Sequence, residues 1–217
     1  MAKVFIVGAA GKVGARLVKL LASNGHQVRA LHRKPEQAAA LQADGAKPVA
    51  GDLTALDVAA FATLIDDADT LVFSAGAGGA GIEVTNAIDG RALELAVTAA
   101  KQAGVTRFVL VSVFPDALRD GERNEGFENY IRVKKLADAH LVASGLDYVI
   151  LRPGTLSDDA GTGRVRADLA IPYDSVPRDD VAATLLAIVE RPNLGRIIIE
   201  LTAGDVPVAD ALAPLAR

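Results

Sequence analysis

Residues 4–17 read Val-Phe-Ile-Val-Gly-Ala-Ala-Gly-Lys-Val-Gly-Ala-Arg-Leu, and this stretch decides the fold. The apolar run Val4–Val7 predicts a strand, and a helical pattern of apolar residues follows from Val13 onward. Glycines at three-residue spacing join the two. A dinucleotide diphosphate needs backbone N–H groups at a helix N-terminus with no side chains in the way. Three glycines alone can make a merely structural turn, but their place between the first strand and the first helix favours nucleotide binding. The residues predicted to contact the nucleotide here are Gly8, Ala10, Gly11, Lys12, Val13 and Gly14.

The rest of the chain repeats this alternation of short apolar runs with helical patterns. Strands that are apolar on both faces and separated by helices indicate a parallel sheet covered on both sides. We therefore predict an α/β fold, a doubly wound Rossmann sheet of about seven strands with the central order 3-2-1-4-5-6, as one domain over residues 1–217. The predicted strands are Val4–Val7, Val28–Leu31, Pro48–Ala50, Thr70–Ser74, Arg107–Ser112, Tyr148–Leu151 and Arg196–Leu201.

Composition and charge exclude several classes of protein. Of 217 residues, 51% are hydrophobic and 23% charged, which is typical of a folded chain rather than a disordered one. The chain has no cysteine, so disulfides and thiolate sites are excluded, and its three histidines are scattered without metal-ligand spacing. A net charge of −4 argues against a nucleic-acid partner. No apolar run is long enough to span a membrane and no secretion signal is evident, so we expect a cytoplasmic protein without a membrane or metal partner.

The end of the second predicted strand indicates which nucleotide is bound. NAD sites usually place an Asp or Glu there, on the ribose 2′-hydroxyl. This chain has His32, Arg33 and Lys34 instead, with no acid before Glu36. A guanidinium binds a 2′-phosphate in bidentate fashion, and a neighbouring lysine adds charge. We predict NADP, with His32 as a spacer or an adenine contact; the alternative is a solvated basic turn.

Two further turns follow strands near the point where the strand order reverses. Asp52 and Leu53 come after the third strand, and Ser74, Ala75 and Gly76 come after the fourth. We predict that both turns bind the nucleotide, with Asp52 on the adenine amino group and Leu53 against the ring. From spacing alone, Asp52 is equally suited to cap the next helix.

Two long stretches, residues 114–127 and 155–177, lack a regular pattern. Both follow carboxyl ends of strands, where open α/β sheets bind ligands, so we expect them to cover a small-molecule substrate. The alternative is a pair of disordered surface loops. The apolar helix face Leu93–Ala100 is a candidate surface for a homodimer, and burial in the core explains it equally well.

Ordered motifs along nearly the whole chain resemble the atypical branch of the short-chain dehydrogenase/reductase superfamily, the group of small NAD(P)-binding proteins that includes epimerase-like and NmrA-like members. The motifs are Gly8–Gly14, Gly51-Asp52-Leu53, Ala103–Val109, Ser144–Tyr148, Leu151-Arg152-Pro153-Gly154 and Arg178–Ala182. The resemblance implies hydride transfer between a nicotinamide and a carbonyl or alcohol carbon. It does not indicate a particular substrate.

The resemblance also assigns roles. Tyr130 would move the oxygen proton, Lys134 would lower the Tyr130 pKa and bind the nicotinamide ribose, and Ser112 would hydrogen-bond the substrate oxygen. The spacing of Tyr130 and Lys134 puts both on one helix face, and a nearby cation favours the phenolate. Asp89 stands where better-studied members carry an asparagine that holds a relay water. Pro153, Gly154 and Thr155 resemble the turn that meets the nicotinamide carboxamide.

Three functions fit these residues. The first is an NADP-dependent oxidoreductase acting on a small carbonyl, quinone or alcohol, and the intact four-residue spacing of Tyr130 and Lys134 favours it over the third. The second is a reductase like the flavin and biliverdin reductases, in which Tyr130 is dispensable. The third is a non-catalytic NADP-binding sensor of the NmrA-like type.

Overall fold

The computed structural model describes residues 1–117 and 124–216. Within those ranges nine strands form one sheet in the order β11-β8-β10-β6-β5-β4-β1-β2-β3, and two further strands pair separately. The strands are β1 (Lys3–Val7), β2 (Gln27–His32), β3 (Lys47–Ala50), β4 (Thr70–Phe73), β5 (Arg107–Val111), β6 (Asp147–Pro153), β7 (Thr155–Ser157), β8 (Arg164–Asp168), β9 (Ser175–Pro177), β10 (Ile197–Ala203) and β11 (Val206–Pro207).

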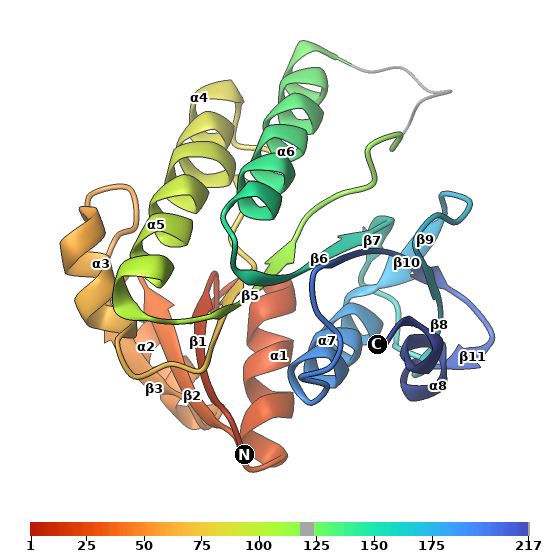
Figure 1. Cartoon of the computed structure of the whole chain (residues 1–217), viewed down its shortest axis with the longest axis horizontal. Helices are drawn as coiled ribbons and strands as arrows, with labels where there is room; N and C mark the ends of the chain where they lie inside the picture. Colours follow the sequence, from red (N-terminus) through yellow and green to blue (C-terminus); the bar gives the residue numbers. More distant parts are fainter. Residues whose placement is uncertain (118–123, 217) are drawn as a thin grey trace.

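The helices connect these strands and lie on both faces of the sheet (Figure 1). They are α1 (Lys12–Ser23), α2 (Gln37–Ala43), α3 (Val58–Ile65), α4 (Ile82–Thr85), the π-helix η1 (Asn86–Ala92), α5 (Leu93–Ala103), α6 (Glu125–Ala143), α7 (Arg178–Val189), α8 (Val208–Leu212) and the 3₁₀ turn η2 (Ala213–Leu215). In the described ranges, none of these helices is long and apolar enough to cross a bilayer.

Alternate residues of each central strand enter two separate cores. Val4 and Ile6 pack with α1 and α7 on one face, whereas Phe5 and Val7 pack with α3, α5 and α6 on the other. A strand buried on both faces needs a continuous apolar run, which explains why the sequence shows runs rather than alternation. The face of α5 that includes Leu93 and Ala100 is fully buried in the second core, so core packing rather than subunit pairing accounts for it.

The α/β class and the central order β3-β2-β1-β4-β5-β6 confirm the sequence predictions. The expected count of about seven strands was too low, because residues 155–177 are not one loop. That stretch contains β7, β8 and β9, and β8 extends the sheet antiparallel to β10. In the other expected loop, residues 118–123 lie outside the described residues, and α6 already begins at Glu125.

Helices α1, α5 and α6 end at or just before a glycine with positive φ. Gly104 ends α5 in the left-handed conformation, and Gly25 and Gly145 follow α1 and α6 with positive φ. The helix after Gly51-Asp52-Leu53 is capped by Asp57, whose carboxylate accepts a hydrogen bond from the Ala60 N–H, so the capping alternative for Asp52 was wrong.

Candidate active site

The glycine turn between β1 and α1 brings backbone into close contact with backbone. Gly8 has φ +84°, and a Cβ there would lie 2.5 Å from the Ala75 nitrogen, so only glycine fits. A Cβ on Gly14 would lie 2.2 Å from the Gly8 carbonyl oxygen. No side chain caps the start of α1 at Gly11. Amide groups of the first turn therefore remain available to an anionic ligand, as a bound diphosphate requires.

A cavity of about 580 Å³ lies at the carboxyl ends of β1 to β5, beside this turn. It gathers most of the nucleotide-contacting and catalytic residues that the sequence singles out. Those lining it are Gly8, Ala10, Gly11, Lys12, Val13, His32, Arg33, Asp52, Leu53, Ser74, Ala75, Gly76, Asp89, Ser112, Tyr130 and Lys134. Gly14 packs under the turn rather than in the cavity, and Lys34 is not among the lining residues.

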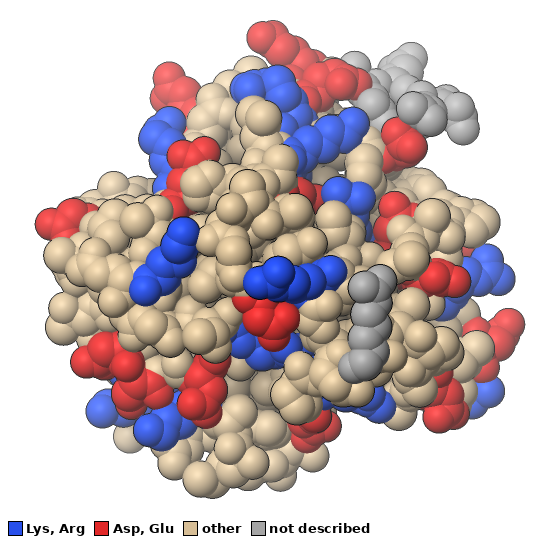
Figure 2. Space-filling model, viewed as in Figure 1, with Lys and Arg blue, Asp and Glu red and all other residues tan. Residues whose placement is uncertain are grey.

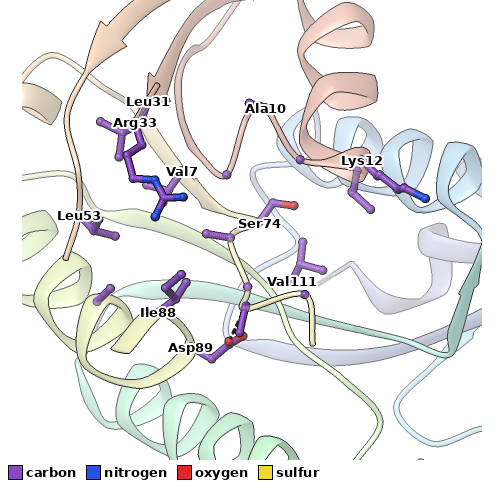
Figure 3. Close-up of a pocket in the computed structure, with 18 of the residues that line it drawn as sticks. Val7, Ala10, Lys12, Leu31, Arg33, Leu53, Ser74, Ile88, Asp89 and Val111 are labelled. Carbon is purple, nitrogen blue, oxygen red and sulfur yellow. Dashed lines mark hydrogen bonds between the residues drawn. The ribbon is translucent and has the colours of Figure 1, made fainter. Parts of the chain in front are cut away.

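One end of the cavity is basic. Figure 3 shows Arg33 reaching into it from the end of β2, facing Leu53, while Lys12 lies at the opposite end. Gln37, which sequence reasoning missed, accepts hydrogen bonds from the backbone N–H groups of Arg33 and Lys34 at 3.2 and 3.0 Å and so fixes this turn. His32 is held by a 3.1 Å contact between its Nδ1 and the Lys34 carbonyl oxygen.

Asp52 stands near Arg33 on the third-strand turn. Its Oδ1 accepts hydrogen bonds from the hydroxyl and the backbone N–H of Thr54, at 2.7 and 3.0 Å. The Thr54 hydroxyl is the main reason that the pKa of Asp52 lies below its usual value, and the charge of Arg33 contributes. Asp52 is therefore an ionised acceptor in the cavity wall.

The ammonium of Lys134 is buried and already engaged. Lys134 Nζ donates to the Val111 carbonyl oxygen at 2.9 Å and lies 3.5 Å from Asp89 Oδ1. The other Asp89 oxygen accepts from the Ala77 N–H at 2.9 Å, an interaction drawn in Figure 3. Asp89 is carried by the π-helix η1, and π-helical turns are often found at functional sites. The structure thus places Asp89 beside Lys134.

Ser112 is engaged as well, through a network that sequence reasoning missed. Its hydroxyl donates to Asp138 Oδ1 at 2.6 Å, and both side chains are buried. Arg152 donates to Asp138 Oδ2 through Nε and lies as close through a terminal nitrogen, both at 2.9 Å. With its proton directed at Asp138, Ser112 presents only lone pairs to the cavity, so in this arrangement it accepts rather than donates a hydrogen bond. The spacing of Tyr130, Lys134 and Asp138, four residues apart on α6, was the available signal.

Tyr130 does not show the expected activation. Burial raises the pKa of its phenol well above the ordinary value, and the negative charges of Asp89 and Asp138 raise it further. The prediction that Lys134 would lower this pKa is wrong for the structure described, because the ammonium is balanced by Asp89 and two carboxylates face the phenol. Tyr130 is a neutral hydrogen-bond donor here.

The turn after β6 lies outside the cavity. Gly154 N–H donates to the Leu201 carbonyl at 2.9 Å and Thr155 N–H donates to the Asp174 carbonyl at 3.1 Å. These amides are therefore occupied, and neither Pro153, Gly154 nor Thr155 lines the cavity. Leu156, the residue after Thr155, does line the cavity.

The two segments expected to cover a substrate meet beside Tyr130. The rings of Phe114 and Tyr173 form an edge-to-face pair with centroids 5.4 Å apart, and the Tyr173 and Thr155 hydroxyls are 2.6 Å apart. Phe114 belongs to a small apolar cluster that also includes Ile131. Among the described residues of the two segments, only Leu156 lines the cavity, and the Phe114 cluster packs against Tyr130 outside the lining.

Comparison with known proteins agrees with this geometry. The model of a family described as NAD(P)H-binding matches residues 8–192, which include the glycine turn and every cavity-lining residue after Val7. The chain belongs to the NAD(P)H-binding family. The match ends just after α7, so it covers the nucleotide cavity and the first three strands after β6.

A curated relative and two solved structures are similar to this chain over nearly its whole length. A Bacillus subtilis protein named uncharacterized sugar epimerase YhfK is 40% identical, with 98% of this chain and 100% of that protein covered. A putative NAD-dependent epimerase/dehydratase from Bacillus halodurans has a TM-score of 0.90 at 31% identity, covering 99% of this chain and 100% of that one. ChuY, described as an anaerobillin reductase from Escherichia coli O157:H7, has a TM-score of 0.78 at 28% identity, covering 94% and 98%.

Proposed function

We propose that the protein is an NADP-dependent oxidoreductase that transfers hydride to or from a small carbonyl, quinone or alcohol. The observation that carries the proposal is one cavity that joins the glycine turn and Arg33 with Tyr130, Lys134 and Ser112. The turn fits a dinucleotide, because a Cβ at Gly8 or Gly14 would collide with backbone and the start of α1 carries no side-chain cap. When bound, the nicotinamide supplies or accepts the hydride.

The proposed preference for NADP rests on the end of β2. A cation that reaches into the cavity suits a 2′-phosphate, and a carboxylate at this position would repel it. We expect calorimetric titration to give NADPH a Kd at least about tenfold below that of NADH, since a charge-assisted bidentate contact contributes about 1.5–3 kcal/mol. Arg33→Glu should remove or reverse the preference.

Lys34→Glu is the matched control, because it makes the same charge change one residue away, outside the cavity lining. Equal affinities for NADPH and NADH in the wild type would overturn the NADP assignment. If neither nucleotide bound, the oxidoreductase proposal itself would fail.

In the proposed chemistry Tyr130 donates a proton to the substrate oxygen during reduction and removes it in the reverse direction. Lys134, one helical turn further along α6, supplies a positive charge to the site, and Asp89 holds the lysine in place. Loss of a general acid typically lowers the rate by 10²–10⁴-fold. Oxidation of NADPH by a panel of quinones and carbonyls should therefore fall about 100-fold or more in Tyr130→Phe. Tyr148→Phe is the control, since Tyr148 packs in the core under α5 and α6 and not in the cavity.

A second candidate is a reductase that does not use Tyr130. Two observations favour it: the Tyr130 phenol is held neutral, and the Ser112 hydroxyl donates to Asp138 rather than toward the cavity. The similarity to a structure described as an anaerobillin reductase points the same way. A rate within about threefold of wild type in Tyr130→Phe, with a linear tetrapyrrole or a free flavin as the acceptor, would favour this function over the first.

Two other results would point elsewhere. A sugar epimerase, the activity in the name of the Bacillus subtilis relative, returns its cofactor unchanged, so net NADPH consumption argues against it. Tight NADPH binding with no turnover across the panel would instead favour a redox sensor.

A further inference from the structure

An ionised carboxylate lies between two of the cavity's cations. Asp158, just after β7, accepts a hydrogen bond from Lys12 Nζ at 2.6 Å through one oxygen. Its other oxygen lies 2.8 Å from a terminal nitrogen of Arg178, at the start of α7. Lys12 and Arg178 both line the cavity, whereas Asp158 is not among the lining residues. One carboxylate thus joins two cations that come from opposite ends of the sequence.

These two cations stand where a diphosphate would be held. Lys12 is the first residue of α1, above the uncapped N-terminus and beside Gly11. A helix N-terminus carries partial positive charge, and two adjacent side-chain cations add to it. Arg33 lies at the other end of the cavity (Figure 3), so this cation pair serves a different part of a dinucleotide.

A second ion pair connects α1 with the start of α7. Arg16, one turn further along α1, pairs with Asp179 at 2.6 Å, and the other Asp179 oxygen accepts a 3.4 Å hydrogen bond from the Gly161 N–H. Asp180 accepts from the Gly163 N–H at 2.7 Å. The start of α7 and the segment after Asp158 are therefore tied to α1, which keeps Arg178 at the cavity independently of its pairing with Asp158.

We infer that Lys12 and Arg178 bind the diphosphate of the nucleotide, and that Asp158 is an internal anion which the diphosphate displaces. The inference rests on the nucleotide site of the proposed function and adds Arg178 to its binding residues. Asp158 then competes with the ligand, so its charge lowers the affinity of the protein for the nucleotide.

The charge of Asp158 is maintained at working pH. The hydrogen bond from Lys12, together with the nearby charge of Arg178, holds the pKa of this carboxyl below its usual value. The carboxylate is half exposed, at 52%, so it can turn toward water once a stronger anion takes its partners. An exposed ion pair is weak enough for such an exchange.

The test is calorimetric titration of NADPH and NADH into wild type, Asp158→Asn and Asp159→Asn. Asp159 is the matched control, an exposed carboxylate one residue away. We expect Asp158→Asn to lower the Kd of both nucleotides by the same factor, about threefold or more, because both contain the diphosphate. Asp159→Asn should change either Kd by less than about twofold.

Arg178→Gln tests whether Arg178 binds the diphosphate. It should raise both Kd values about tenfold, and Asp158→Asn should have a smaller effect in the Arg178→Gln background, because one of the two displaced contacts is gone. Inorganic diphosphate should compete with NADPH less well in Arg178→Gln than in wild type. A thermal melt of each variant confirms that it is folded before its titration is interpreted.

The outcomes separate this inference from the proposed function. An unchanged or raised Kd in Asp158→Asn, or an unchanged Kd in Arg178→Gln, overturns the inference while leaving NADP binding intact. Failure of the proposed function appears instead in the wild type, as absence of binding. An effect of Asp158→Asn on NADPH alone would place Asp158 at the 2′-phosphate and also contradict the inference.

Discussion

Tyr130 shows how far neighbours can reverse the role of a single side chain. A lysine four residues away on a helix normally favours the phenolate. Here burial raises the pKa of the phenol, the charges of Asp89 and Asp138 raise it further, and Asp89 also balances the lysine. The residue types and spacing could be recognised in the sequence, whereas the sign of the pKa shift depended on residues from η1 and on burial.

The raised pKa of Tyr130 has a consequence at alkaline pH. In the unfolded chain Tyr130 ionises near pH 10, but in the folded protein its phenol stays neutral. Above about pH 10 the folded state therefore holds one proton more than the unfolded state, and the free energy of unfolding falls as pH rises. Below that pH both states are protonated and the residue has no such effect. We expect the difference spectrum between wild type and Tyr130→Phe to show no phenolate from Tyr130 at pH 10, and the variant to lose less stability above that pH. Half-ionisation of Tyr130 below pH 10 in the folded protein would contradict the burial argument.

At the scale of elements, the register of α6 and the π-helix η1 bring together the residues proposed to be catalytic. Positions four apart on α6 bring Tyr130, Lys134 and Asp138 to one face, and η1 turns Asp89 toward that face. The helix α6 was predictable from its apolar periodicity. The π-helical turn was not, since its extra residue per turn leaves no distinct pattern in sequence.

The glycine turn gives a prediction at this scale. Replacing Gly14 by Ala puts a methyl group 2.2 Å from the Gly8 carbonyl, so α1 must move away from the turn. Overpacking of this kind typically destabilises by about 1–3 kcal/mol, and we expect NADPH affinity to fall as well, because the amides at the start of α1 move. Urea unfolding and calorimetry measure the two effects.

Gly104→Ala is the matched control for that variant. Gly104 has φ +74° but open space around its Cβ, so the substitution should cost only the backbone strain of about 1 kcal/mol and leave the NADPH Kd unchanged. If Gly14→Ala bound NADPH as well as Gly104→Ala does, the close approach at Gly14 would not be what shapes the site.

On the scale of the whole molecule, the carboxyl ends of the strands form the cavity, and the amino ends contribute to stability. The cavity lies at the carboxyl ends of the strands, and an ion-pair network stabilises the other end. There Arg107, at the start of β5, pairs with Asp147 at 2.6 Å. It also donates to the carbonyl of Ile188 near the end of α7 and to those of Arg191 and Leu194 in the turn that follows α7. On the described face in Figure 2, acidic and basic side chains are intermixed over the surface.

Arg107→Met should therefore reduce stability without changing the site. The substitution removes the guanidinium from three carbonyl oxygens, of which those of Ile188 and Arg191 keep a backbone N–H donor, and it leaves Asp147 without its partner. We expect the free energy of unfolding to fall by about 3 kcal/mol. Urea denaturation measures the loss, and the NADPH Kd of the folded variant should match wild type. Arg196→Met, at an exposed arginine with one carbonyl contact, should change stability by less than about 1 kcal/mol.

The sequence predicted well where local pattern and tertiary structure agree. The central strands and the glycine turn follow from apolar runs and glycine spacing, whereas Ser112, Tyr130 and Lys134 came from the family resemblance. Residues 155–177 were misassigned because β7, β8 and β9 are short and lie among glycine, proline and aspartate, so only pairing with distant strands makes them strands. The ion pairs of Asp158 and Asp138 could not be predicted from local pattern either, because their partners Lys12 and Arg152 lie on other elements.

The two edge strands of the nine-stranded sheet influence whether the protein aggregates at high concentration. One margin is β3, which contains Lys47 and Pro48, and the other is the two-residue β11, which ends at Pro207. A proline cannot donate the hydrogen bond that an added strand would require, and lysine or shortness further discourages such addition. Both margins therefore resist the edge-to-edge pairing that leads β-proteins to aggregate. At these two margins, growth of the nine-stranded sheet into a continuous intermolecular sheet is therefore disfavoured.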